Sequence, residues 1–93
     1  RDGDKAGWEE AIRIGIAYME KAADVDKKHP QYLNELGMYR KYLADEFEAD
    51  SLNEKALVEY RLALKAYKEA VRRSPRDETA LKGIEDLAKL EIR

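Results

Sequence analysis

The only histidine of this 93-residue chain, His29, stands directly before Pro30. General acid–base catalysis needs a titratable side chain that a partner orients inside a pocket. A histidine at a helix junction marked by proline has no such partner that the sequence identifies, so we interpret His29 as a solvated turn residue. The chain also has no cysteine, no glycine-rich phosphate loop and no nucleophile elbow. We therefore expect no enzymatic activity, no cofactor and no metal site.

Carboxylates gather near the end of one predicted helix, at Asp45, Glu46, Glu48 and Asp50. Glu46 and Asp50 lie one helical turn apart, which places them on the same side of a helix. A calcium loop would need ligands at alternate positions around a glycine, and this segment lacks that pattern. We interpret the group as a solvated acidic helix end; the alternative is that these acids attract Lys or Arg from a neighbouring helix.

Basic side chains gather later in the chain and allow two interpretations. They could attract an acidic peptide or a phosphate, or they could complement the negative end of a helix dipole on a solvated face. We favour the second interpretation. The residues are Lys65, Lys68, Arg72, Arg73 and Arg76.

Tyrosine is frequent and also allows two interpretations. Several rings could line a peptide-binding groove, or each ring could be half-buried with its hydroxyl group reaching water or a partner. We favour half-buried rings. The residues are Tyr18, Tyr32, Tyr39, Tyr42, Tyr60 and Tyr67.

These side chains must be positioned by helices, because apolar residues recur at helical spacing and no stretch alternates with period two. The predicted fold class is all-α, one domain over 1–93 with short connections that make successive helices antiparallel. An open array of helical hairpins and a small closed bundle both fit this pattern. The predicted helices span about 4–28, 30–49, 52–73 and 75–92.

Two kinds of signal mark the helix junctions. Pro30 and Pro75 suit first helical positions and disfavour helical geometry at the residue before them. Two Ser-to-acid pairs have the spacing of capping boxes. These pairs are Ser51 with Glu54 and Ser74 with Asp77.

The apolar stripes of the four helices define a predicted core. Two charged residues fall inside these stripes, Arg40 on the second helix and Glu59 on the third. In an antiparallel hairpin that turns near Ser51 they reach similar heights, so we predict that they pair or that each extends to the rim. The predicted core residues are Trp8, Ile12, Ile16, Met19, Leu33, Leu36, Leu43, Phe47, Ala56, Tyr60, Ala63, Tyr67, Ala70, Leu81, Ile84 and Leu87.

Charge balance excludes several partners. The chain has 18 Lys and Arg against 20 Asp and Glu, a formal net charge of −2, whereas a nucleic-acid-binding domain usually carries a clear basic excess. No apolar run approaches the roughly 18 residues of a membrane span, and Arg1-Asp2-Gly3-Asp4 does not begin a signal peptide. We expect a soluble chain with no nucleic-acid or membrane partner. Ile14, Ala17 and Met38 fall outside the main stripes and could join copies.

Part of the chain resembles a tetratricopeptide repeat. Leu36-Gly37 is similar to the first-helix motif of that repeat, and the second-helix pattern is matched by Ala63, Tyr67, Ala70 and Pro75. The resemblance implies close helix pairs, with an aromatic side chain that fills the gap between pairs. It also implies a peptide-binding module.

The second and third helices also resemble a helix pair of the 14-3-3 proteins. The run Gly37-Met38-Tyr39-Arg40-Lys41-Tyr42-Leu43-Ala44-Asp45 is similar to the G-D-Y-Y-R-Y-L-A-E run of that family, and Ala66-Tyr67-Lys68-Glu69-Ala70 is similar to A-Y-x-x-A. In that family an Arg-Tyr pair of the run helps to bind phosphoserine. The resemblance therefore implies that Lys41 and Tyr42 contact a peptide or a phosphate.

Two partial resemblances within one four-helix chain favour a designed or chimeric protein assembled from natural-like helix hairpins. The first functional hypothesis is accordingly a structural helical scaffold with no biochemical activity and no required partner. The alternative is a peptide-binding module, similar to a tetratricopeptide repeat or to 14-3-3, with a groove between the second and third helices. Self-association is the other interaction that we expect.

Overall fold

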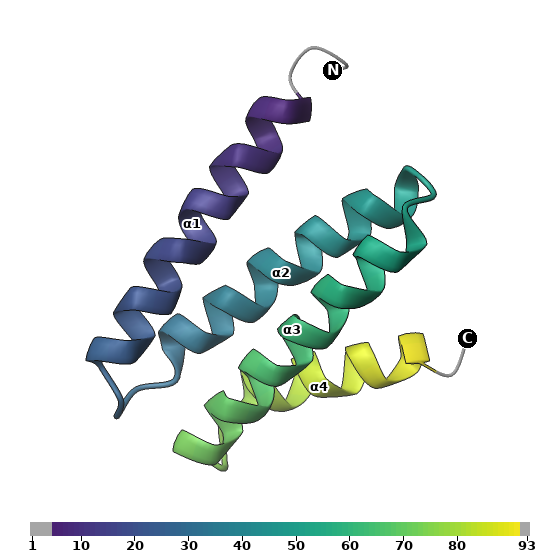
Figure 1. Cartoon of the computed structure of the whole chain (residues 1–93). Helices are drawn as coiled ribbons and strands as arrows, with labels where there is room; N and C mark the ends of the chain where they lie inside the picture. Colours follow the sequence, from purple (N-terminus) through teal and green to yellow (C-terminus); the bar gives the residue numbers. More distant parts are fainter. Residues whose placement is uncertain (1–4, 92–93) are drawn as a thin grey trace.

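The computed structural model describes residues 5–91, which form α1 (Lys5–Val25), α2 (Gln31–Ala49), α3 (Asn53–Arg73) and α4 (Glu78–Glu91). This described part contains no strand, so the predicted all-α fold is confirmed. Each helix runs back against the one before it (Figure 1). The predicted helix start at residue 4 and helix end at residue 92 lie outside the described residues.

Helix α1 ends at Val25, three residues earlier than predicted. The carboxylate of Asp26 accepts hydrogen bonds from the backbone N–H groups of Lys28 and His29, at 3.1 and 3.2 Å. A side chain that binds nearby backbone donors in this way stabilises a turn in competition with the helix. The local chemistry of Asp26 thus ends the helix before Pro30 is reached.

Helix α4 begins at Glu78 rather than at the predicted Pro75. The Asp77 carboxylate accepts a hydrogen bond from the backbone N–H of Ala80 at 3.0 Å. Because a helix leaves its first N–H groups without intrahelical partners, this bond makes Asp77 the N-cap. The predicted capping box that starts at Ser74 is therefore wrong, and the Ser74–Pro75 step belongs to the turn.

Ser51 ends α2 instead of capping α3. Its φ of 64° lies in the left-handed region. The backbone N–H of Ser51 donates to the carbonyl of Glu48 at 3.0 Å, and that of Leu52 donates to Phe47 at 2.8 Å. This pair of bonds is the Schellman C-cap. The predicted capping box of Ser51 with Glu54 is wrong, because the N-cap position of α3 is Leu52 and has no side-chain cap bond.

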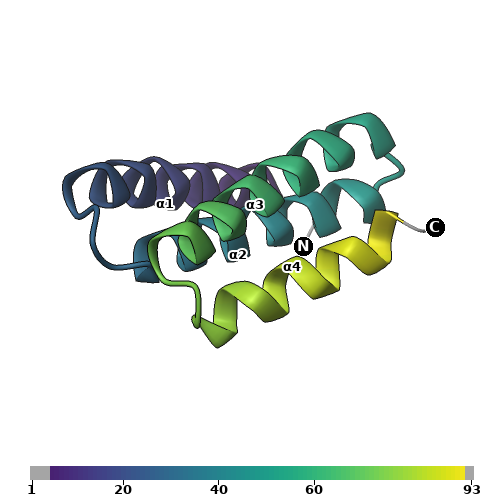
Figure 2. The same cartoon turned by 90° about the horizontal axis from the view of Figure 1, so that it is seen from below.

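The four helices form an open, two-layered array. The Cα extents are 39 × 31 × 17 Å, and the smallest of these accommodates two helices packed 8–10 Å apart. Helix α2 packs against α1, α3 and α4, and α3 packs against α4. Within the described residues the backbone of α1 approaches only α2, so the ring of a closed bundle is not completed. Figures 1 and 2 show α1 and α4 at opposite ends of the array.

The core lies mainly between α2 and α3 and agrees with most of the prediction. Trp8, Ile12, Met19, Tyr60 and Ile84 are partly buried and pack against this core. Leu81 was expected in the core and is 46% exposed, while Ala80 beside it is fully buried, so the core-facing stripe of α4 is rotated from the prediction. The buried residues of this apolar cluster are Ile16, Ala23, Leu33, Leu36, Leu43, Phe47, Ala56, Ala63, Ala66, Tyr67, Ala70, Ala80 and Leu87.

The ring of Tyr67 joins three helices. It projects from α3 and lies against Gly37 of α2 and Gly83 of α4. A Cβ atom at either glycine would come within 2.7 Å of the ring. Such a distance is far below the 3.5–4.0 Å of an ordinary carbon contact, so both helices approach the ring this closely because they have no side chain there.

Arg73 fastens the end of α1 to α3. Its guanidinium Nη1 donates to the backbone carbonyls of Ala23 and Asp26, at 3.0 and 2.8 Å. The last carbonyls of a helix lack intrahelical donors and carry partial negative charge, so a cation stabilises them. The solvated role predicted for Arg73 is wrong, because only 11% of its side chain is exposed.

Candidate functional site

The structure separates the basic residues that the sequence grouped near the end of α3. Arg73 caps α1, and Arg72 pairs with Glu69 through a hydrogen bond of 2.8 Å from its Nε. This bond from Arg72 lowers the pKa of the Glu69 carboxyl. Lys65 and Lys68 line a groove that Arg72 and Glu69 also border, but among the described residues they have no carboxylate partner. These basic residues are thus divided between the cap of α1 and the lining of this groove.

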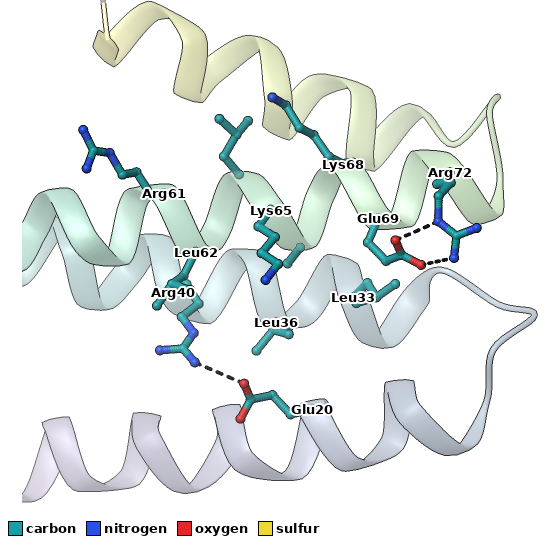
Figure 3. Close-up of a pocket in the computed structure, with 12 residues that line it drawn as sticks. Glu20, Leu33, Leu36, Arg40, Arg61, Leu62, Lys65, Lys68, Glu69 and Arg72 are labelled. Carbon is teal, nitrogen blue, oxygen red and sulfur yellow. Dashed lines mark hydrogen bonds and ion pairs between the residues drawn. The ribbon is translucent and has the colours of Figure 1, made fainter.

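This groove lies between α1 and α3, with α2 as its floor, and has a volume of about 700 Å³. We call it the α1–α3 groove. It exists because α1 and α3 both pack on α2 while their backbones stay apart. Its apolar lining consists of Leu33, Leu36, Leu62, Leu64 and Ala66. Its charged lining consists of Glu20, Arg40, Arg61, Lys65, Lys68, Glu69 and Arg72 (Figure 3).

Arg40 connects the three helices that form the groove. Its guanidinium donates to Glu59 of α3 at 2.9 Å and to Glu20 of α1 at 3.2 Å. The predicted approach of Arg40 and Glu59 is therefore confirmed. Only 7% of the Glu59 side chain is exposed, and a buried carboxylate needs such a charged partner. The bond to Glu20 extends the pair to the α1 wall.

The wall that α3 forms also carries cations without a partner. Within the described part of the chain, Arg61, Lys65 and Lys68 take part in no ion pair, whereas Arg40 and Arg72 each have a carboxylate. In Figure 3, Lys65 extends from α3 across the groove. Arg61 and Lys68 leave α3 on the side away from α1. Of these three cations, Lys65 is therefore the one that reaches into the groove in the structure.

Lys41 and Tyr42, the residues predicted to contact a peptide or phosphate, do not line this groove. The ammonium group of Lys41 lies 3.0 Å from the Asp45 carboxylate, one turn along α2. Tyr42 is 48% exposed on the same helix. Their contact with a ligand stays a prediction, and it would require a phosphate to compete with Asp45 for Lys41.

His29 lies in the exposed turn between α1 and α2. Its Nδ1 is 3.0 Å from an Asp26 carboxylate oxygen, and 63% of its side chain is exposed. This side-chain hydrogen bond is the main cause that lowers the pKa of Asp26. The pair therefore organises a turn, as the interpretation of His29 as a turn residue implies.

Asp45, in the acidic end of α2, bonds within α2 and to α3. Asp45 accepts hydrogen bonds from Lys41 and from the hydroxyl group of Tyr60 on α3. Among the side chains that the structure describes, those of residues 7–90, no three acidic or histidine side chains cluster in a way that could hold a metal ion. Asp45 therefore acts as a link between α2 and α3 in this structure.

A second, smaller hollow of about 190 Å³ lies on the other side of α3, toward α4. Leu57, Leu64, Leu87 and Leu90 line it together with Arg61. Leu64 and Arg61 border both hollows, so the exposed face of α3 separates the α1–α3 groove from this smaller hollow. Periodicity alone did not reveal either hollow, because it shows the apolar face of each helix and not the angle between helices.

None of the four described helices has the length and apolar character needed to cross a membrane. The resemblances to tetratricopeptide repeats and to 14-3-3 proteins stay predictions, as does a designed or chimeric origin. Comparison of the chain with models of protein families, with curated proteins and with solved structures finds no match.

Proposed function

We propose that this chain is a non-catalytic helical scaffold whose α1–α3 groove receives a peptide segment of another protein. The observation that carries this proposal is the groove itself: about 700 Å³ of open space over leucine side chains, bordered by cations that lack an ion-pair partner. Concave sites of this size, with an apolar lining and a few polar groups, are the usual places where proteins bind ligands.

The rigidity of the floor supports the same role. Leu33 and Leu36 are buried in the core that α2 shares with α3, so they form a surface that does not need to rearrange. Arg40 is fixed by Glu59 and Glu20 on two different helices. A preformed surface reduces the ordering cost of association.

A nitrogen-15 NMR titration of the full chain tests this function. We would add helical peptides of acidic, neutral and basic character, and separately a phosphoserine peptide, each up to 1 mM. Shift changes centred on Leu33, Leu36 and Lys65 are expected from at least one helical peptide. Changes centred on Lys41 and Tyr42 with the phosphopeptide alone would move the site to the position that the 14-3-3 resemblance implies. If no peptide changes the spectrum, the chain is an inert scaffold.

A further inference from the structure

The free cations of the α3 wall follow the helical repeat. Arg61, Lys65 and Lys68 occupy positions i, i+4 and i+7, so they lie along one side of α3 over about 10 Å. Long lysine and arginine side chains at such positions turn easily toward a neighbour. A partner in the groove that presents carboxylates at the same spacing would meet Lys65 directly, and would meet Arg61 and Lys68 after their side chains turn toward it.

The lining of the groove also restricts the conformation of its occupant. All three surrounding elements are helices, whose interior backbone N–H and C=O groups bond within the helix. An extended peptide over the leucine floor would find no backbone partners there, and unpaired buried backbone groups are costly. A helical peptide satisfies its own backbone groups and can place an apolar face on the floor.

We propose that the α1–α3 groove binds an amphipathic helix of a partner protein that carries acidic side chains at i, i+4 and i+7 toward α3. This inference rests on the proposed function and adds the chemistry of the ligand. The apolar face of the ligand contacts Leu33, Leu36 and Leu62. One carboxylate pairs with Lys65, which extends across the groove, and the others pair with Arg61 and Lys68 once these side chains turn toward the ligand. Complementary charge of this kind sets the choice and the orientation of the partner.

The test uses three fluorescent peptides with the same leucine face. The first carries Glu at i, i+4, i+7 and i+11, and the second carries Lys at these positions. The third is the first peptide with two central residues replaced by proline, which prevents a helix. Fluorescence anisotropy measures binding to the full chain at low and at high salt. The charge-reversed variant Lys65→Glu/Lys68→Glu is compared with Lys27→Glu/Lys28→Glu, which makes the same charge change in the turn after α1.

The acidic helix is expected to bind at least tenfold more tightly than either other peptide, and to lose affinity as salt screens the charges. Lys65→Glu/Lys68→Glu should lower the affinity for the acidic peptide at least tenfold and raise the affinity for the Lys peptide. Lys27→Glu/Lys28→Glu should change either affinity less than twofold. Circular dichroism would verify that both variants fold. Equal binding of the Lys or proline peptide overturns this inference but leaves a peptide-binding groove. Absence of binding by all three overturns the proposed function as well.

Discussion

Alanine in place of Gly37 or Gly83 should destabilise the fold, although alanine normally favours a helix. A Cβ at Gly37 would lie 2.7 Å from Cζ of Tyr67, and one at Gly83 would lie 2.7 Å from Cε2 of the same ring. The ring is only 6% exposed and contacts both helices, so a shift away from one is limited by the other. The added methyl group must therefore push the helices apart or force the ring out of its rotamer.

Gly15 provides a matched control within the same chain. It lies in the middle of α1, and a Cβ there would meet Cε2 of Tyr39 at an ordinary contact distance of 3.5 Å. Gly15→Ala should raise the free energy of unfolding by about 1 kcal/mol, the helix-propensity difference. Overpacking costs about 1–3 kcal/mol. The free energies of unfolding of Gly37→Ala and Gly83→Ala should therefore each lie about 1–3 kcal/mol below that of Gly15→Ala.

Thermal unfolding followed by circular dichroism measures the difference. For a domain of this size, 1 kcal/mol corresponds to a Tm change of about 4–8 °C. Tyr67→Leu removes the ring atoms that the new Cβ atoms would meet, so in this background Gly37→Ala should lose its penalty. If Gly37→Ala and Gly83→Ala stabilise the chain as much as Gly15→Ala, the close approach of both helices to the ring is refuted.

Three further perturbations follow from the contacts. Ser51→Gly should raise the free energy of unfolding by about 0.5–1 kcal/mol in urea titrations, because relief of the left-handed strain at the α2 C-cap outweighs the extra chain entropy that glycine gives the unfolded state; an unchanged midpoint would contradict this. Arg40→Met should cost about 3–5 kcal/mol because Glu59 loses its charged partner, and Arg40→Met/Glu59→Leu should recover most of the loss, as urea unfolding of both variants would show. Burial raises the pKa of Tyr67 above its ordinary value of 10.0. The stabilisation of the fold by the neutral Tyr67 side chain is therefore complete below about pH 10 and is lost as pH rises through the folded-state pKa. Wild type should therefore lose stability relative to Tyr67→Phe above about pH 10, and parallel pH profiles of the two would exclude this effect.

The parts of the fold that depend on one helix at a time could be predicted from the sequence. Apolar periodicity located four helices, and the positions of Arg40 and Glu59 within two stripes predicted a contact that the structure contains at 2.9 Å. This worked because a short connection between antiparallel helices sets the relative heights of their residues. Leu81 was misplaced because α4 has few turns, and a stripe centred on Ala80 fits it as well.

The helix ends depended on side-chain chemistry that spacing alone describes poorly. Ser51 has the spacing of an N-cap with Glu54, yet the same residue serves as the left-handed C-cap of the preceding helix. Either role satisfies free backbone groups, and the Leu52 bond to Phe47 selects the second.

The α1–α3 groove could not be predicted because it depends on how far α1 stands from α3. That separation is set by residues distant in sequence: Arg40 links α2 to Glu20 of α1, and Arg73 links the end of α3 to the last carbonyls of α1. Both arginines come from the helices that form the floor and the opposite wall. These two side chains attach α1 to the array, so the groove depends on how the core helices anchor α1 and not on any motif within one helix.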